Sequence, residues 1–287
     1  MESIQVKAYA KINLGLDVLR RRPDGYHEVR MVMQTIRLFD KLTVRTTHTP
    51  GITIRTNLSY LPCDENNLIY RAAALFLEET RQKAGVYITL EKHIPVAAGL
   101  AGGSSDAAAT LTALNELYRT GLSLKHLQEL GVRLGADVPY CLLQGAALSE
   151  GIGEILTPLP APPAAHCLVV KPPVSVSTRY VYEHLTADTA PHPDIDALLD
   201  ALKAGSLPNL AAHLGNTLES VTIPLHPEIA AIKEELLQLG ALGSLMSGSG
   251  PTVFGLFSDR QAAERAFYHF KVGEYGRQTY LTGFWNR

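Results

Sequence analysis

Residues 6–18 alternate between apolar and polar side chains. Positions 6, 8, 10, 12, 14, 16 and 18 are apolar, and the positions between them carry Lys7, Tyr9, Lys11, Asn13 and Asp17. A period of two predicts a half-buried strand, with the polar side chains on its second face. A Pro-Asp-Gly sequence at residues 23–25 then predicts a turn that ends this strand.

Similar patterns continue to the end of the chain, but strands and helices do not alternate regularly. Short apolar runs predict strands at residues 42–45, 52–55, 86–90, 167–170 and 252–257. Helical periodicity predicts helices that start near residues 67, 104, 123, 195, 227 and 261. The mixture, without the repeating unit of a doubly wound sheet, predicts an α+β fold.

A proline-rich segment divides the chain. Residues 158–163 contain four prolines, which is typical of a linker between compact regions. A chain of 287 residues suits two domains of modest size. The sequence therefore predicts one domain over residues 1–160 and a second over residues 161–287.

Composition and charge narrow the function classes. The formal net charge is −2, so no overall basic field attracts nucleic acid or anionic lipid. No stretch approaches 18 uninterrupted apolar residues, and the first residues lack the features of a signal peptide. The three cysteines have no metal-ligand spacing, which favours reduced thiols. We therefore expect a cytoplasmic protein that binds neither nucleic acid nor a membrane.

A loop of small residues enters the predicted helix near residue 104. Such a loop can bind phosphate, because backbone N–H groups approach the anion closely and the helix dipole favours negative charge. Ser104 or Ser105 is expected to cap the helix. On the loop alone, a tight helix-entry turn is nearly as good an interpretation. The candidate ATP-binding residues are Pro95, Val96, Ala97, Ala98, Gly99, Leu100, Ala101, Gly102, Gly103, Ser104 and Ser105.

This loop differs from two familiar nucleotide-binding motifs. It lacks Gly-Lys-Ser/Thr, so it is not a Walker A loop. Ala101 stands where a Gly-x-Gly-x-x-Gly pattern needs its second glycine, which disfavours a dinucleotide-binding dehydrogenase. A second glycine-rich turn, at residues 248–250, would by itself be a tight turn more often than a ligand site.

Three segments together resemble the GHMP kinase superfamily, namely residues 10–14, 95–109 and 248–252. Residues 23–28, 135–139 and 151–154 resemble the branch that acts on 4-diphosphocytidyl-2-C-methyl-D-erythritol in non-mevalonate isoprenoid biosynthesis. The resemblance implies an N-terminal ATP-binding domain and a C-terminal ferredoxin-like α/β sandwich. It also implies transfer of phosphate from ATP, with Mg²⁺, to the 2-hydroxyl group of that cytidine diphosphate methylerythritol.

The resemblance assigns the catalytic roles to Lys11 and Asp137. By pattern alone, Lys11 would be a solvated lysine and Asp137 a helix cap. The matching family residues lie beside the reacting hydroxyl. Asp137 is therefore expected to accept the proton of the hydroxyl as a general base, while Lys11 stabilises the developing negative charge. The sequence does not identify the side chains that hold Mg²⁺.

The resemblance also assigns the acceptor site. Tyr26 and His27 would bind the cytosine base by stacking and hydrogen bonding, and Tyr182 would close the stack, although Tyr180 is a near neighbour. The predicted substrate-binding residues are Asn13, Tyr26, His27, Tyr182, Gly248, Ser249 and Gly250.

Other interpretations stay open at this stage. Another GHMP kinase, such as a homoserine kinase, is the main alternative, and a non-catalytic ligand sensor is a second. Ala97, Ala98 and Ala101 depart from the glycines that are frequent in the family. Alanine allows the same backbone approach provided that its φ is negative. The sequence leaves the choice between monomer and homodimer open.

Overall fold

The computed structural model describes residues 2–286, which form two compact units that interleave along the chain. The first unit contains the described residues up to Ala10, with Leu38–Val96 and Ala101–Leu143. The second contains Lys11–Arg37, Ala97–Leu100 and the residues from Gln144 onward. Strands β1 (Ser3–Arg21) and β2 (His27–Thr47) contribute residues to both units.

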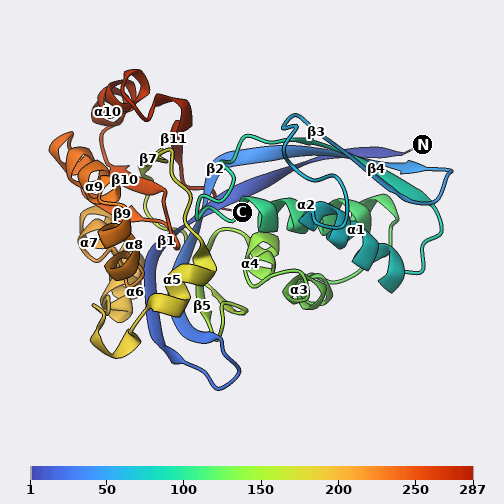
Figure 1. Cartoon of the computed structure of the whole chain (residues 1–287), viewed down its shortest axis with the longest axis horizontal. Helices are drawn as coiled ribbons and strands as arrows, with labels where there is room; N and C mark the ends of the chain where they lie inside the picture. Colours follow the sequence, from blue (N-terminus) through green and yellow to red (C-terminus); the bar gives the residue numbers. More distant parts are fainter. Residues whose placement is uncertain (1, 287) are drawn as a thin grey trace. The chain divides into compact units, whose positions relative to one another are not determined.

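In the first unit, a sheet is covered on one face by helices (Figure 1). The strand order is β3–β4–β2–β1. Helix α1 packs on α2 and β3, while α4 packs against α2 and α3. The other elements of the unit are β3 (Ile52–Thr56), β4 (Gly85–Glu91), α1 (Leu68–Glu79), α2 (Gly102–Leu117), α3 (Leu124–Val132) and α4 (Val138–Leu143).

In the second unit, the same two long strands join another set of neighbours. The order is β6–β5–β2–β1–β8, where β8 runs parallel to β1 and pairs Leu16 with Asn216. Helix α6 packs so closely on β1 that a side chain at Gly15 would meet Ile195 and Leu198. The further elements here are β5 (Ala146–Glu150), β6 (Ile155–Pro158), β8 (Gly215–Asn216), α5 (Thr178–His184), η1 (Ala187–Thr189), α6 (Ile195–Lys203), α7 (Leu207–Ala212) and α8 (Glu219–Leu225).

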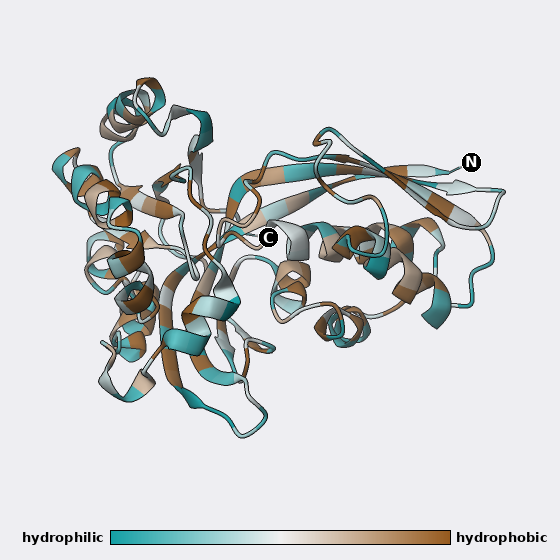
Figure 2. Ribbon diagram, viewed as in Figure 1, coloured by the Kyte–Doolittle hydropathy of each residue, from teal (hydrophilic) through white to brown (hydrophobic). Residues whose placement is uncertain are grey.

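A second sheet in this unit is antiparallel, in the order β11–β7–β10–β9. Helix α9 packs on β9 and β10, and α10 packs on β7 and β11. Figure 2 shows hydrophobic and hydrophilic residues side by side along α9, as an amphipathic helix requires. The elements are β7 (His166–Val170), α9 (Glu228–Gln238), β9 (Gly243–Met246), β10 (Val253–Phe257), α10 (Arg260–Val272), η2 (Gly276–Gln278) and β11 (Thr279–Gly283).

The predicted α+β class and most predicted elements are confirmed, with one correction to the first strand. From Ala10 to Val18, β1 is buried on both faces, because α6 packs at Gly15 and the glycine-rich turn packs near Asn13 on the face that was predicted to be polar. The proline-rich segment 158–163 lies within the second unit, and the domain boundary at residue 160 stays a prediction. Among residues 2–286, no helix is both long and apolar enough to cross a membrane.

Candidate active site

The polar face of β1 places Lys11 and Asn13 inside the second unit. Lys11 is only 5% exposed and Asn13 is fully buried. The Lys11 Nζ donates to Asn13 Oδ1 at 2.7 Å. The Lys11 N–H donates to the carbonyl of Leu100 at 3.1 Å, so the strand is fastened to the small-residue loop. A buried ammonium with a defined partner is the kind of group that supports chemistry rather than solubility.

The loop at residues 95–105 has an unusual backbone. Ala97, Gly99 and Ala101 have φ values of 51°, 71° and 55°, whereas Ala98 and Leu100 between them are not left-handed. Such alternation of hand occurs in the backbone nests that bind anions. The condition of a negative φ is therefore not met at Ala97 and Ala101. Each left-handed alanine costs about 1–2 kcal/mol, and strain of this kind concentrates at functional sites.

Within the second unit, the glycine-rich turn packs against residues 97–100 of this loop. The turn joins β9 to β10, and its Ser247 Oγ donates to the carbonyl of Gly99 at 3.0 Å. A side chain on Gly248 would lie 3.2 Å from Gly99 O and 3.7 Å from Asn13 Oδ1. Three segments that are distant in sequence, at residues 11–13, 97–100 and 247–250, thus meet in one place.

Helix α2 begins without the predicted serine cap. Its N-cap is Ala101, in the left-handed conformation and without a side-chain hydrogen bond. Ser105 instead donates its hydroxyl to the carbonyl of Tyr9 at 2.6 Å. The first turn of α2 therefore keeps N–H groups that no side chain caps, which suits an anion at this end of the helix.

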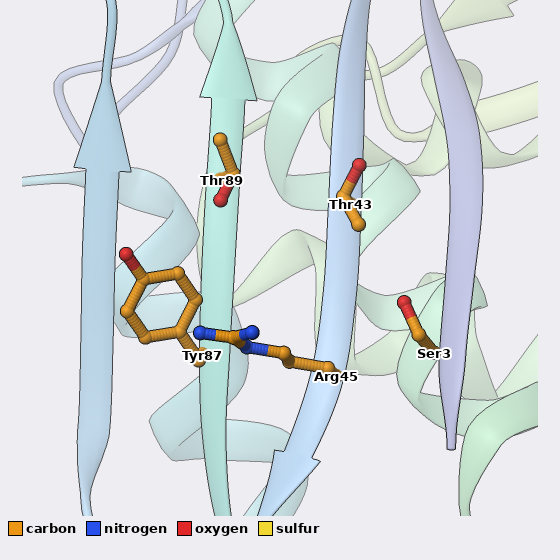
Figure 3. A pocket seen from close by; sticks show the side chains of 5 residues that line it. All are labelled: Ser3, Thr43, Arg45, Tyr87 and Thr89. Carbon is orange, nitrogen blue, oxygen red and sulfur yellow. The ribbon is translucent and has the colours of Figure 1, made fainter. Parts of the chain in front are cut away.

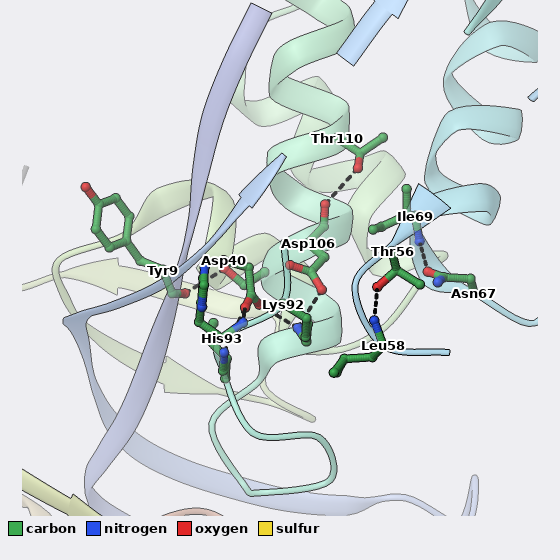
Figure 4. Close-up of polar contacts among 12 residues, drawn as sticks. Tyr9, Asp40, Thr56, Leu58, Asn67, Ile69, Lys92, His93, Asp106 and Thr110 are labelled. Atoms are coloured by element: carbon green, nitrogen blue, oxygen red, sulfur yellow. Dashed lines mark hydrogen bonds and ion pairs between the residues drawn. The ribbon is translucent and has the colours of Figure 1, made fainter. Parts of the chain in front are cut away.

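Three charged side chains are buried behind this first turn (Figure 4). Lys92 Nζ lies 2.5 Å from Asp40 Oδ2 and 2.6 Å from Asp106 Oδ2. Asp40 Oδ1 also accepts the N–H groups of His93 and Ile94, at 2.5 and 2.8 Å. The cluster links Lys92, which precedes the loop, to Asp106, which follows it, and to Asp40 of β2.

The cluster also explains why Gly102 is a glycine. A side chain there would meet Ile94 Cγ2 at 2.9 Å and Lys92 Nζ at 3.0 Å. Burial raises the pKa of Asp106 well above its usual range, although Lys92 opposes this shift. Burial lowers the pKa of Lys92, but the attraction of Asp106 and Asp40 outweighs it and the pKa is raised. The sequence patterns predicted a role for neither Lys92 nor Asp40. The one sequence feature that could have pointed to Lys92 is its place at the end of an apolar strand, shortly before Pro95.

Asp137 lies in the first unit, in the turn between α3 and α4. It directly precedes α4, and its carbonyl accepts the N–H of Cys141 at 3.0 Å. Gly131 allows the close packing of α3 on Val138, since a side chain there would meet Val138 Cγ1 at 3.0 Å. The start of α4, and Asp137 with it, is thereby set by packing against a neighbouring helix.

The predicted cytosine-binding residues lie in the second unit. His27 and Tyr182 face each other, with ring centroids 5.2 Å apart and planes at 44°. Tyr180 stacks on His184 of its own helix, and the choice of Tyr182 over Tyr180 stays a prediction. Burial lowers the pKa of His27, and the nearby charge of Arg21 lowers it further. Tyr26 is 60% exposed.

One residue that sequence reasoning missed holds the glycine-rich turn. The buried Asn216 donates both amide hydrogens, to Met246 O and Gly248 O, each at 2.8 Å. Its Oδ1 accepts the N–H of Leu218 at 3.0 Å. Asn216 comes from a strand of two residues, which no periodic pattern could have revealed.

A separate pocket of about 400 Å³ lies on the first unit's sheet, away from these residues. Figure 3 shows its side chains standing on the face of the sheet that is turned away from the helices. Arg45 lies over the ring of Tyr87, 4.1 Å from the centroid. No predicted site residue lines this pocket, whose walls are Ser3, Thr43, Arg45, Tyr87 and Thr89.

Comparison with protein families gives two matches. Residues 67–145 match the GHMP kinases N terminal domain, and residues 198–271 match GHMP kinases C terminal. A 4-diphosphocytidyl-2-C-methyl-D-erythritol kinase from Lachnoclostridium phytofermentans is 61% identical, over 99% of this chain and 98% of the relative. The enzyme of the same name from Lachnospira eligens is 50% identical, over 98% of each chain.

Solved structures agree with this relationship. A crystal structure of 4-(cytidine 5'-diphospho)-2C-methyl-D-erythritol kinase superimposes with a TM-score of 0.83 at 38% identity, covering 99% of this chain and all of that one. Homoserine kinase from Cytophaga hutchinsonii gives a TM-score of 0.77 at 22% identity, covering 99% of this chain and 94% of that one. At that identity the likeness to homoserine kinase shows a common fold.

Proposed function

The chain belongs to the 4-diphosphocytidyl-2-C-methyl-D-erythritol kinase family of GHMP kinases, and we propose on this basis that it phosphorylates the 2-hydroxyl of that cytidine diphosphate methylerythritol. It is an ATP-dependent small-molecule kinase of isoprenoid precursor biosynthesis. The observation that best supports the proposed site is the meeting of residues 11–13, 97–100 and 247–250 within one unit.

The reaction needs an activated hydroxyl and neutralised charge. Asp137 takes the proton of the acceptor hydroxyl, and Lys11 stabilises the negative charge that develops on its oxygen. Lys11 is suited to this task because it is buried and oriented by Asn13. Phosphoryl transfer depends mainly on such positioning, since there is little covalent chemistry for the protein to perform.

Two segments supply backbone N–H groups for the phosphates of ATP. They are the loop whose Ala97, Gly99 and Ala101 have positive φ, and the uncapped first turn of α2. Mg²⁺ in kinases is usually held by one or two side-chain oxygens together with substrate phosphates. Asp106 fits this need, because its Oδ1 is buried without a hydrogen-bond partner beside the loop. Bound there, the ion would neutralise phosphate charge.

Tyr26, His27 and Tyr182 bind the cytosine base at the other end of the acceptor. The lowered pKa of His27 favours its neutral imidazole, in which one ring nitrogen can donate a hydrogen bond and the other can accept one. Tyr26 and Tyr182 supply faces for stacking on the pyrimidine.

Phosphorus NMR tests the proposal directly. The protein is incubated with ATP, Mg²⁺ and 4-diphosphocytidyl-2-C-methyl-D-erythritol, and we expect a new phosphomonoester signal together with the signals of ADP. Homoserine under the same conditions serves as the competing acceptor. Phosphate transfer to homoserine but not to the cytidine compound would overturn the proposal.

A further inference from the structure

Helix α5 carries Tyr182 and is short. It contains seven residues, and Val181 is its one buried residue. Arg179 and Glu183 form an exposed ion pair within the helix, and Tyr180 stacks on His184, also within it. These internal contacts stabilise the helix but do not determine where it sits. The position of Tyr182 must therefore depend on the contacts that α5 makes with its surroundings.

A pair of hydroxyl groups provides such a contact. Thr178 Oγ1 and Ser249 Oγ lie 2.8 Å apart, a normal hydrogen-bond distance. Thr178 and Tyr182 are four residues apart on a helix, so they share one face. The contact that orients Thr178 toward the glycine-rich turn consequently orients Tyr182 toward His27, whose ring lies 5.2 Å away.

The other partner, Ser249, is a fixed point. Its carbonyl accepts the hydroxyl of Thr222 at 3.3 Å, and Asn216 holds the carbonyl of Gly248 just before it. Ser249 is 6% exposed, and the turn is closed by a hydrogen bond from the Gly250 N–H to the Ser247 carbonyl. The Thr178–Ser249 hydrogen bond thus links α5 to the glycine-rich turn.

We propose that the Thr178–Ser249 hydroxyl pair positions Tyr182 for the acceptor base, which makes Thr178 a specificity-determining positioning residue. The inference rests on the proposed function, since it concerns the cytidine end of the same site. It further implies that the glycine-rich turn supports the binding of both ligands. Ser247 donates to Gly99 in the loop proposed to bind ATP, and Ser249 contacts Thr178 on the helix that carries Tyr182.

The test uses nearly isosteric variants of the full chain. Thr178→Val keeps the side-chain shape and removes the hydroxyl, so KM for the cytidine substrate should rise about threefold to tenfold while KM for ATP and kcat change less than about twofold. Thr178→Ser should restore the normal KM. Arg179→Ala is the matched control, because it removes a contact of the same helix that does not reach the turn.

Two further measurements distinguish this role from others. Ser249→Ala should raise the same KM, and the double variant should be no worse than the poorer single variant, since both remove one bond. Additive losses would mean that the two hydroxyls act separately, and would overturn the pairing. Equal increases in the KM for ATP would indicate general disorder of the turn and would also overturn it.

Calorimetric titration with CDP separates this inference from the proposed function. If the unmodified protein fails to bind CDP, the cytidine site itself is wrong. If it binds CDP and Thr178→Val binds it equally well, the site stands and the positioning role is wrong. Weaker CDP binding by Thr178→Val, with unchanged ADP binding, is the result we expect.

Discussion

At the scale of the residue, the burial of the charged Lys92 between Asp40 and Asp106 is the feature with a high desolvation cost. All three side chains are at most 5% exposed. Charges are buried at high cost unless they are paired, so each member depends on the other two. Lys92 packs against Gly102, and the three paired side chains hold the first turn of α2 in place.

Lys92→Met should lower the stability of the protein by about 3–5 kcal/mol, because it leaves two carboxylates without their counter-charge. Urea unfolding followed by circular dichroism would measure the change. Lys83→Met, at an exposed position, is the control and should change stability by less than about 0.5 kcal/mol. The double variant Lys92→Met/Asp106→Asn should recover part of the loss. A Lys92→Met variant as stable as the control would contradict the importance of the cluster.

Asp137 is a residue whose role can be separated from its structural position. Asp137→Asn should keep the fold and reduce kcat about 10²- to 10⁴-fold, because asparagine cannot accept the proton. Steady-state kinetics with a thermal unfolding measurement would check both parts. Asp200→Asn, at an exposed carboxylate on α6, should leave kcat unchanged. Near-normal turnover in folded Asp137→Asn would remove Asp137 from the mechanism.

At the scale of the element, the loop and the first turn of α2 contain two adjacent glycines with different reasons for being small. Gly102 faces inward, against Ile94 and Lys92. Gly103 has more room, since the nearest atom to an added side chain is Leu68 Cδ1 at 3.4 Å. A side chain at Gly103 therefore tests ligand binding with little disturbance of packing.

Gly103→Val should raise the Kd for ATP by about tenfold or more and leave the Kd for the cytidine substrate nearly unchanged. The branched side chain would occupy the space where phosphate oxygens approach the helix. Gly102→Ala is the contrasting variant, in which stability should fall because the methyl group meets Lys92. Titration of each ligand against both variants would show the difference. An unchanged Kd for ATP in Gly103→Val would contradict the binding of ATP phosphates at the first turn of α2.

The elements also show how far sequence patterns can be followed. Period two revealed β1, and Asn67 marked the start of α1 as predicted, with its side chain accepting the N–H of Ile69. The serine cap of α2 was wrong because the loop ends in a left-handed alanine, a conformation that composition does not reveal. Asn216 and the Lys92 cluster escaped notice because their partners are distant in sequence. Local patterns specify elements, whereas buried polar networks arise only when the chain has folded.

At the scale of the whole molecule, two ligands must be recognised independently, and Tyr26 offers a test. Tyr26→Ala should raise KM for the cytidine substrate about ten- to a hundredfold, because a base–aromatic stack contributes roughly 1–3 kcal/mol. The KM for ATP should stay nearly constant. Tyr26→Phe should have a mild effect, since stacking uses the ring face.

The control for Tyr26 is Tyr60→Ala, which removes another exposed tyrosine, in the first unit. It should change neither KM. A surface tyrosine that merely packs on its own hairpin would show a stability loss without ligand selectivity. If Tyr26→Ala affects ATP and the cytidine substrate alike, or affects neither, the acceptor must be reconsidered.

The interleaving of the two units has a consequence for synthesis on the ribosome. Gln34, in the N-terminal part of the second unit, donates to the carbonyl of Trp285, a partner 251 positions later in the chain. At about 5–20 residues per second, that partner emerges on the order of 10–50 s afterwards. Three neighbours of Gln34 that are buried in the folded protein stay exposed during this time, namely Val32, Met33 and Ile36. The chain is therefore more exposed to aggregation during its synthesis than after it has folded.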